Sequence, residues 1–221
     1  MKKQIILTTS LFLFLGLHLI NAQATTGECT IKYNLFKGDY QSKKFGDAYP
    51  NWMYLMDSCP KLSINIYKLG DKMVQALYKK ATDKSETRTL INRIYTQRLE
   101  NYPTKDPAKV HSDYATFLVK NKLASDDEVF EILELAYSLD PTRMGVKNIY
   151  RYFQGITDAN KDTNPQKVFD TYDDVLESVG EKLDDYAKKL RDLNAKVEAG
   201  QELDKRQKQN LRAYTINSKA L

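Results

Sequence analysis

The side chains in this sequence best suited to covalent chemistry are its two cysteines, Cys29 and Cys59. In an exported protein, an even number of cysteines indicates a disulfide. Position 44 lies midway between them, and residues 41–44 form the most turn-like stretch of this region. Two helices that fold back at this turn bring their outer ends together, so we predict a Cys29–Cys59 disulfide. The alternative is a pair of buried free thiols in a helix interface.

Paired carboxylates are the other groups that suggest a reaction. Two acidic side chains, one acting as an acid and the other as a base or nucleophile, cleave glycosidic bonds, so an enzyme acting on cell-wall glycan is the alternative function. Adjacent acids also occur at helix starts and on exposed faces, where they complement the helix dipole. We therefore predict no enzyme and assign no catalytic residue. The adjacent pairs are Asp126-Asp127, Asp173-Asp174 and Asp184-Asp185.

Metal and cofactor sites are not indicated. His111 is the one histidine outside the apolar N-terminal run, and two cysteines without a nearby histidine cannot complete a tetrahedral zinc site. Acids and amides alternate between residues 158 and 164 as in a Ca²⁺ loop, but the sixth and twelfth positions are Thr163 and Phe169 instead of Gly and Glu. No nucleotide-binding or hydrolase motif occurs. We expect neither a metal nor a cofactor.

The N-terminus has the order of features found in a secretory signal peptide. A positive start is followed by an uncharged, largely apolar run over residues 5–20 and by an Ala-x-Ala site. We predict a signal peptide over residues 1–24, cleaved after Ala24 or after Ala22; the alternative is a retained membrane anchor. No later stretch is apolar enough to span a bilayer. We therefore expect a protein of the periplasm or cell envelope with no transmembrane segment after cleavage.

Charge and composition narrow the class further. Lys and Arg number 34 against 29 Asp and Glu, an excess too small to indicate nucleic-acid binding. Gly and Pro are few, at 9 and 6, and no sustained alternating apolar pattern occurs. Both features favour an all-α protein.

Apolar residues recur at helical spacing along most of the chain. Helix starts are marked by Ser125 as a cap and by Asp106 and Asn164, each followed by a first-turn proline. The predicted helices are 28–41, 45–58, 62–82, 86–101, one from 107, one from 126, 143–157 and one from 165. Their expected inward residues include Ile31, Leu35 and Phe36 in the first helix and Phe169, Tyr172 and Leu176 in the eighth.

Three helical segments end alike, with a bulky residue eight positions before a proline. The three pairs are Trp52 with Pro60, Tyr95 with Pro103, and Leu133 with Pro141. A proline ends one helix and fits the first turn of the next, and one apolar stripe cannot be buried by a single helix. We therefore predict an α-α superhelix of about four stacked antiparallel helix pairs. Trp52 is expected to lie buried between the first two pairs.

This arrangement resembles the tetratricopeptide repeat. Phe45, Ala48, Trp52 and Pro60 resemble the second helix of such a repeat, and Leu69-Gly70 resembles the Leu-Gly pair of the first helix. Ala136 with Pro141 matches the Ala and terminal Pro of a repeat. Tyr95 and Pro103 occupy equivalent positions in the second pair.

The whole chain also resembles a family of exported tetratricopeptide-like proteins of the Bacteroidota, which has no assigned activity. The resemblance rests on Cys29, on Trp52 shortly before Cys59-Pro60, and on the segment Ile66-Tyr67-Lys68-Leu69-Gly70. It implies a non-catalytic interaction or scaffold module, or a subunit of an envelope assembly, whose partners are envelope proteins. Because the chain becomes strongly charged from Gly180 onward, we also predict two parts after the signal peptide: a helical repeat domain over 25–180 and charged C-terminal helices over 181–221.

Two regions are candidates for partner binding. The charged C-terminal region has one apolar face from Leu183 to Val197 and a helix stop at Gly200. It is either a solvated cap on the last pair or a protruding docking arm. The second candidate is a tyrosine-rich groove made from the odd-numbered helices, since many of the 15 tyrosines fall in the first two pairs.

Overall fold

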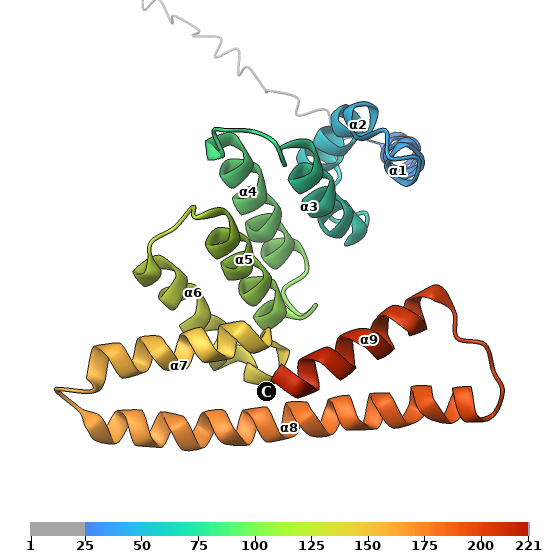
Figure 1. Ribbon diagram of the computed structural model, residues 1–221. Helices are drawn as coiled ribbons and strands as arrows, with labels where there is room; N and C mark the ends of the chain where they lie inside the picture. The colour runs from blue at the N-terminus through green and yellow to red at the C-terminus, as the bar shows by residue number, and fades with distance from the viewer. Residues whose placement is uncertain (1–24, 221) are drawn as a thin grey trace, which may run out of the picture.

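The computed structural model describes residues 25–220, and every regular element in that range is a helix (Figure 1). The all-α prediction is confirmed for this part of the chain, whereas the predicted signal peptide lies outside the described residues. The elements are α1 (Thr26–Gln41), α2 (Phe45–Ser58), α3 (Asn65–Leu77), α4 (Ser85–Asn101), α5 (Pro107–Asn121), α6 (Asp126–Leu139), the 3-10 helix η1 (Pro141–Arg143), α7 (Val146–Asn160), α8 (Pro165–Glu198) and α9 (Lys205–Ala220).

Each α-helix packs mainly against the helices that precede and follow it in the chain. The main contacts between α-helices that skip a neighbour join α1 with α3 and α5 with α7. Figure 1 shows the pairs following one another from α1 and α2 at one end to the long helix α8 at the other. One continuous apolar cluster extends through them from Cys29 to Ile156.

The first helix pair is closed by a disulfide between Cys29 and Cys59, whose α-carbons lie 5.9 Å apart. Cys29 lies in the first turn of α1, and Cys59 is the C-terminal cap of α2. The chain reverses at Ser42 and Lys43, where Lys43 adopts a left-handed conformation with φ of 58°. This turn lies where the sequence predicted it, so the predicted pairing of Cys29 with Cys59 is found.

Local capping accounts for several helix starts. The Ser125 side chain accepts a hydrogen bond of 3.2 Å from the Glu128 backbone N–H, and Asn164 similarly caps α8 ahead of Pro165. Asp106 is an exception among the expected caps. Its backbone is left-handed, with φ of 68°, and its side chain makes no cap hydrogen bond. The Asp106 carboxylate instead accepts a hydrogen bond of 3.0 Å from Nε of Arg143.

Trp52 joins the first helix pair to the second, as predicted. Its side chain is fully buried, and the indole N–H donates a hydrogen bond of 3.0 Å to the Ile66 carbonyl oxygen. The ring lies so close to Gly70 that a β-carbon there would stand 2.2 Å from the indole nitrogen. Phe130 of α6 lies against Gly155 of α7 in the same way, with 2.3 Å to such a β-carbon. In both places an aromatic ring requires glycine on the following helix.

The predicted repeat-core residues differ in burial. Pro103 is exposed after the end of α4 and contributes no core contact. The buried members are Ala48, Trp52, Gly70, Tyr95 and Ala136, and the half-buried ones are Phe45, Pro60, Leu69 and Pro141.

Two predicted inward faces are wrong in part. Ile31 and Leu35 of α1 are 61% and 49% exposed, while Phe36 is fully buried. The reason is that α1 packs against α2 and α3 only, so part of its apolar surface has no neighbour among the described residues.

On α8 the predicted stripe faces inward only in part. Val175 and Val179 pack against the core, and the Tyr172 ring lies 5.9 Å from that of Phe153 in α7. Phe169, Tyr172 and Leu176 are largely exposed, and the buried face also carries Thr171 and Ser178. Further along, Lys182 is buried, and its Nζ donates a hydrogen bond of 2.5 Å to the Thr142 carbonyl oxygen of η1. Lys182 lies on the same side of α8 as Thr171 and Ser178, and this side of the helix therefore points toward η1.

The charged C-terminal region begins within a helix. The expected domain boundary after residue 180 falls inside α8, which continues without a break to Glu198. The chain then turns at Gly200, with φ of 74°, and α9 packs back on α8. The rings of Tyr186 and Tyr214 stack 5.5 Å apart between the two helices. Figure 1 shows this hairpin extending beyond α7, with α9 on the side of α8 that faces α3 to α5.

Candidate functional site

A groove of about 820 Å³ lies between the second and third helix pairs and the start of α9. Its walls are the first half of α3, the end of α4, the loop to α5 and the first turns of α5, with contributions from η1 and α9. The first two of these segments line the groove together because α3 and α4 are antiparallel, which brings the start of α3 beside the end of α4.

The groove is positively charged. Seven basic and three acidic side chains line it. Among the described residues, two of the cations are paired: Lys109 with Asp113 at 2.7 Å, and Arg143 with Asp106. The remaining cations form no ion pair with any described residue. These unpaired cations are Lys68, Lys72, Arg98, Lys105 and Arg206.

Asp71 is the one groove carboxylate without a cationic partner within ion-pair distance. Its Oδ1 accepts a hydrogen bond of 2.7 Å from the Gln75 side-chain amide. Burial raises the pKa of Asp71, and this effect outweighs the hydrogen bond from Gln75 and the attraction of Lys72. Burial thus disfavours the charged form of the one groove carboxylate that has no cationic partner.

Arg98 is the most constrained of the five unpaired cations. Its side chain is half-buried, and its Nε is shielded from solvent yet donates no hydrogen bond within the described structure. A buried N–H group without an acceptor is costly and uncommon in folded proteins. Arg98 thus lines the groove, while its buried Nε has no acceptor among the described residues.

Three tyrosines build the walls around these cations. The Tyr67 hydroxyl donates a hydrogen bond of 2.9 Å to the Pro60 carbonyl oxygen. The Tyr102 hydroxyl donates one of 2.9 Å to the Lys61 carbonyl oxygen. The two rings meet edge to face, 5.9 Å apart. Burial raises the pKa of Tyr67 to about 12 and also raises the pKa values of Tyr95 and Tyr102. All three tyrosines therefore remain neutral at physiological pH.

The predicted tyrosine groove is therefore found in part. Tyr67 comes from α3, an odd-numbered helix, but Tyr95 lies in α4 and Tyr102 directly follows that helix. The cations were not anticipated by sequence reasoning. Lys68 and Lys72 are spaced for one helical face, but nothing in the sequence places Arg98 or Arg206 opposite them.

The residues first considered for chemistry lie elsewhere. All six acids of the three adjacent pairs are exposed on α6 and α8. No group of three His, Cys, Asp or Glu side chains arranged to hold a metal occurs in residues 25–220. His111 is half-buried, burial lowers its pKa, and it lines a separate, mainly apolar pocket of about 310 Å³ with Tyr114 and Leu135.

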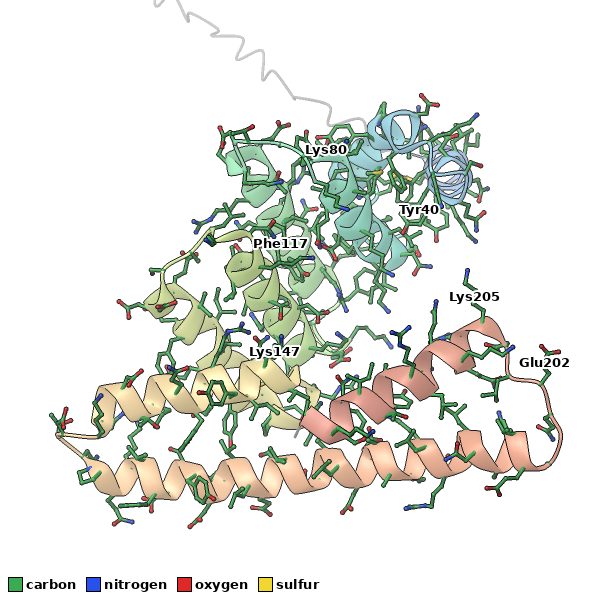
Figure 2. The ribbon with its side chains drawn as sticks, in the orientation of Figure 1. Tyr40, Lys80, Phe117, Lys147, Glu202 and Lys205 are labelled. Carbon is green, nitrogen blue, oxygen red and sulfur yellow. A yellow bond between two sulfur atoms is a disulfide. The ribbon has the colours of Figure 1, made fainter. Side chains whose placement is uncertain are left out.

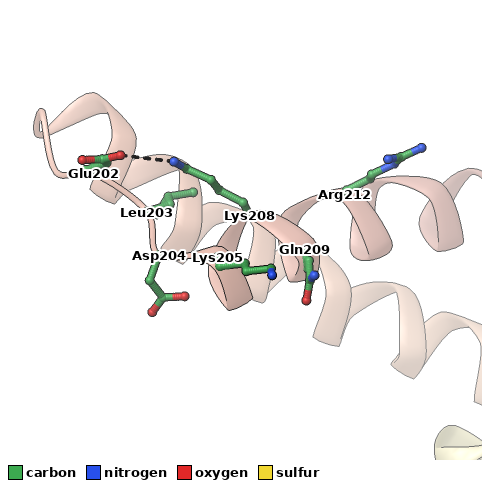
Figure 3. Close-up of a pocket in the computed structure, with 7 residues that line it drawn as sticks. All are labelled: Glu202, Leu203, Asp204, Lys205, Lys208, Gln209 and Arg212. Atoms are coloured by element: carbon green, nitrogen blue, oxygen red, sulfur yellow. Dashed lines mark hydrogen bonds and ion pairs between the residues drawn. The ribbon is translucent and has the colours of Figure 1, made fainter. Parts of the chain in front are cut away.

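A further hollow of about 750 Å³ lies at the tip of the C-terminal hairpin (Figure 3). Part of its polar lining is occupied by local contacts, while the side chains of Lys205, Gln209 and Arg212 make none among the described residues. The Asp204 carboxylate accepts from the Gln207 backbone N–H at 2.8 Å, and the Gln207 side chain accepts from the Asp204 N–H at 2.9 Å, which together cap the start of α9. Lys208 pairs with Glu202 at 3.3 Å. These contacts explain the hollow as a helix start, so the groove is the stronger candidate site.

Comparison of the chain with protein-family models, with curated proteins and with solved structures finds no match. Within residues 25–220, no helix combines the length and apolar character needed to cross a bilayer.

Proposed function

We propose that this protein is a non-catalytic interaction module of the cell envelope that binds a partner protein in its groove. The observation that carries the proposal is the set of five unpaired cations around the tyrosine-lined groove between the second and third helix pairs. A surface with fixed aromatic walls and unused hydrogen-bond donors suits recognition of a second molecule.

The proposal includes a tetratricopeptide-like arrangement of the helix pairs. Its support is the sequential packing of the pairs and the contact of Trp52 with Gly70, the residues that carried the sequence resemblance. Arrays of helix pairs bury a continuous core and leave extended concave surfaces for partners. The groove is such a surface, and α9 forms one of its sides.

An envelope location is supported by two features. The disulfide between Cys29 and Cys59 suits an oxidising compartment, and the N-terminal residues have the pattern of a signal peptide. In that setting the protein acts either by itself or as a subunit of an envelope assembly.

Site-specific cross-linking tests the proposal. A photo-reactive amino acid is placed at Lys68, in the groove, or at Lys80, which lies in the α3–α4 loop at the other end of the same helix pair (Figure 2). We expect the Lys68 position to capture one predominant envelope protein and the Lys80 position to capture none above background. Equal capture from both positions, or capture from Lys80 alone, argues against the groove as the binding site.

A further inference from the structure

We infer that the groove binds an extended, carboxylate-rich segment of the partner protein, with Arg98 receiving one of the carboxylates. This inference rests on the proposed function and adds the chemistry of the ligand. It is argued from the charges, from the state of the Arg98 side chain and from the form of the groove.

The charge of the groove favours an anion. Lys68, Lys72 and Lys105 are exposed along one side, and Arg206 reaches the groove from α9. Because no described carboxylate forms an ion pair with them, a negatively charged ligand relieves their mutual repulsion further. A peptide segment with several carboxylates can neutralise these cations at the same time and release the counterions that otherwise surround them.

Arg98 supplies the specific contact. A guanidinium group presents several N–H donors in a planar fork that matches the two oxygens of a carboxylate. Tyr95, which is buried, and Tyr102, which is half-buried, line the groove beside it, and their rings reduce the access of water that weakens such a pair. Of the five unpaired cations Arg98 alone is half-buried, so water and salt screen its charge least and it gains most from a carboxylate.

The form of the groove points to a protein segment. The cations lie within a hollow whose opposite side carries Arg206, so a flat membrane surface cannot contact them all. The aromatic walls offer apolar surface to side chains that alternate with acids along an extended peptide. A simple polyanion uses the charges but leaves those rings without a partner.

The test uses the full mature chain with its disulfide intact. The probe is a fluorescein-labelled peptide that alternates Glu with Leu, compared with a matched peptide that alternates Gln with Leu; binding is followed by anisotropy. We expect saturable binding of the Glu peptide that weakens as salt is raised, and at least about tenfold weaker binding of the Gln peptide.

Three variants locate the contact. Arg98→Gln should weaken binding of the Glu peptide by about tenfold or more, since it removes a charged hydrogen-bond donor. Asp71→Asn should strengthen binding, because it removes the unpaired carboxylate from the groove. Lys80→Gln, which removes one charge outside the groove, should leave affinity unchanged. Circular dichroism and the melting temperature show whether each variant is folded, and Arg98→Lys keeps the test valid if Arg98→Gln is unstable.

Several outcomes overturn the inference. Equal binding of the Glu and Gln peptides contradicts the role of charge, and an equal effect of Arg98→Gln and Lys80→Gln contradicts the role of Arg98. Tighter binding of polyphosphate or a sulfated glycan than of the peptide identifies a general polyanion site. If Lys68 still cross-links a partner protein while no acidic peptide binds, the proposed function stands and this inference about its ligand fails.

Discussion

The indole ring of Trp52 in α2 rests against the α-carbon of Gly70 in α3, while its N–H donates to the Ile66 carbonyl oxygen one turn earlier. One side chain thereby fixes both the separation and the rotation of two successive helix pairs. The position of α3 in turn determines where Lys68 and Lys72 lie in the groove. Packing at this contact and binding in the groove are therefore linked.

Gly70→Ala should destabilise the protein by about 1–3 kcal/mol, because the new β-carbon overlaps the indole ring and the ring has no free space to enter. Urea unfolding followed by circular dichroism measures the change. Gly180→Ala is the matched control, since Gly180 lies inside α8 with nothing within 4 Å of the added carbon. That variant should be more stable than the wild type by about 0.5–1 kcal/mol. Equal effects at the two glycines would contradict the packing described.

Trp52→Ala should cost about 3–5 kcal/mol, because a fully buried aromatic side chain is lost together with its hydrogen bond. Phe169→Ala should cost far less, since Phe169 is 64% exposed on α8. A solvent-like fluorescence maximum for Trp52 in the folded protein, or a large loss of stability in Phe169→Ala, would show that the helices pack in a different register.

Reduction of the Cys29–Cys59 disulfide should lower the melting temperature. The bridge closes a loop with a sequence separation of 30 residues, and closing such a loop adds about 3–4 kcal/mol in the chain-entropy model. A thiol titration of the folded, unreduced protein should find no free cysteine, and the Cys29→Ser, Cys59→Ser double variant should match the reduced protein. Two reactive thiols in the folded protein would refute the bridge.

The pH dependence of stability should change in opposite directions when Asp71 or Asp106 is replaced by Asn. Burial raises the pKa of Asp71 above the ordinary aspartate pKa, so its contribution to stability is complete below that ordinary pKa and is lost as pH rises through the folded-state pKa. Asp71→Asn should therefore be more stable than the wild type at neutral pH, with the advantage disappearing in acid.

For Asp106, the hydrogen bond from Arg143 lowers the pKa, so its contribution is present above its unfolded value and is lost as pH falls. Asp106→Asn should be less stable than the wild type at neutral pH. Urea midpoints measured across the acid range check both variants. Parallel pH profiles for the two would mean that these environments are assigned wrongly.

Features set by short-range geometry could be predicted from the sequence. The turn at residues 41–44 follows from the spacing of Cys29 and Cys59, the bounds of α2 were predicted as they are found, and the Ser125 cap follows from its side-chain chemistry. In each case a few neighbouring residues determine the outcome.

Features that depend on which elements meet could not be predicted. Apolar spacing shows that Ile31 and Leu35 share a helical face, but it cannot show that α1 lacks a neighbour on that side. The unpaired state of Arg98 likewise depends on the positions of acids far away in the chain. The groove became visible only once α3, α4, α5 and α9 were placed together.

The central claim is that the groove holds the partner protein, and a charge reversal tests it most directly. Tagged wild-type protein, Lys68→Glu and Lys80→Glu are each purified from the envelope, and co-purifying chains are quantified by mass spectrometry against a tag-only control. We predict one partner that is recovered with the wild type and with Lys80→Glu but is lost with Lys68→Glu, all three proteins having the same melting temperature. Full recovery of that partner with Lys68→Glu would contradict the claim.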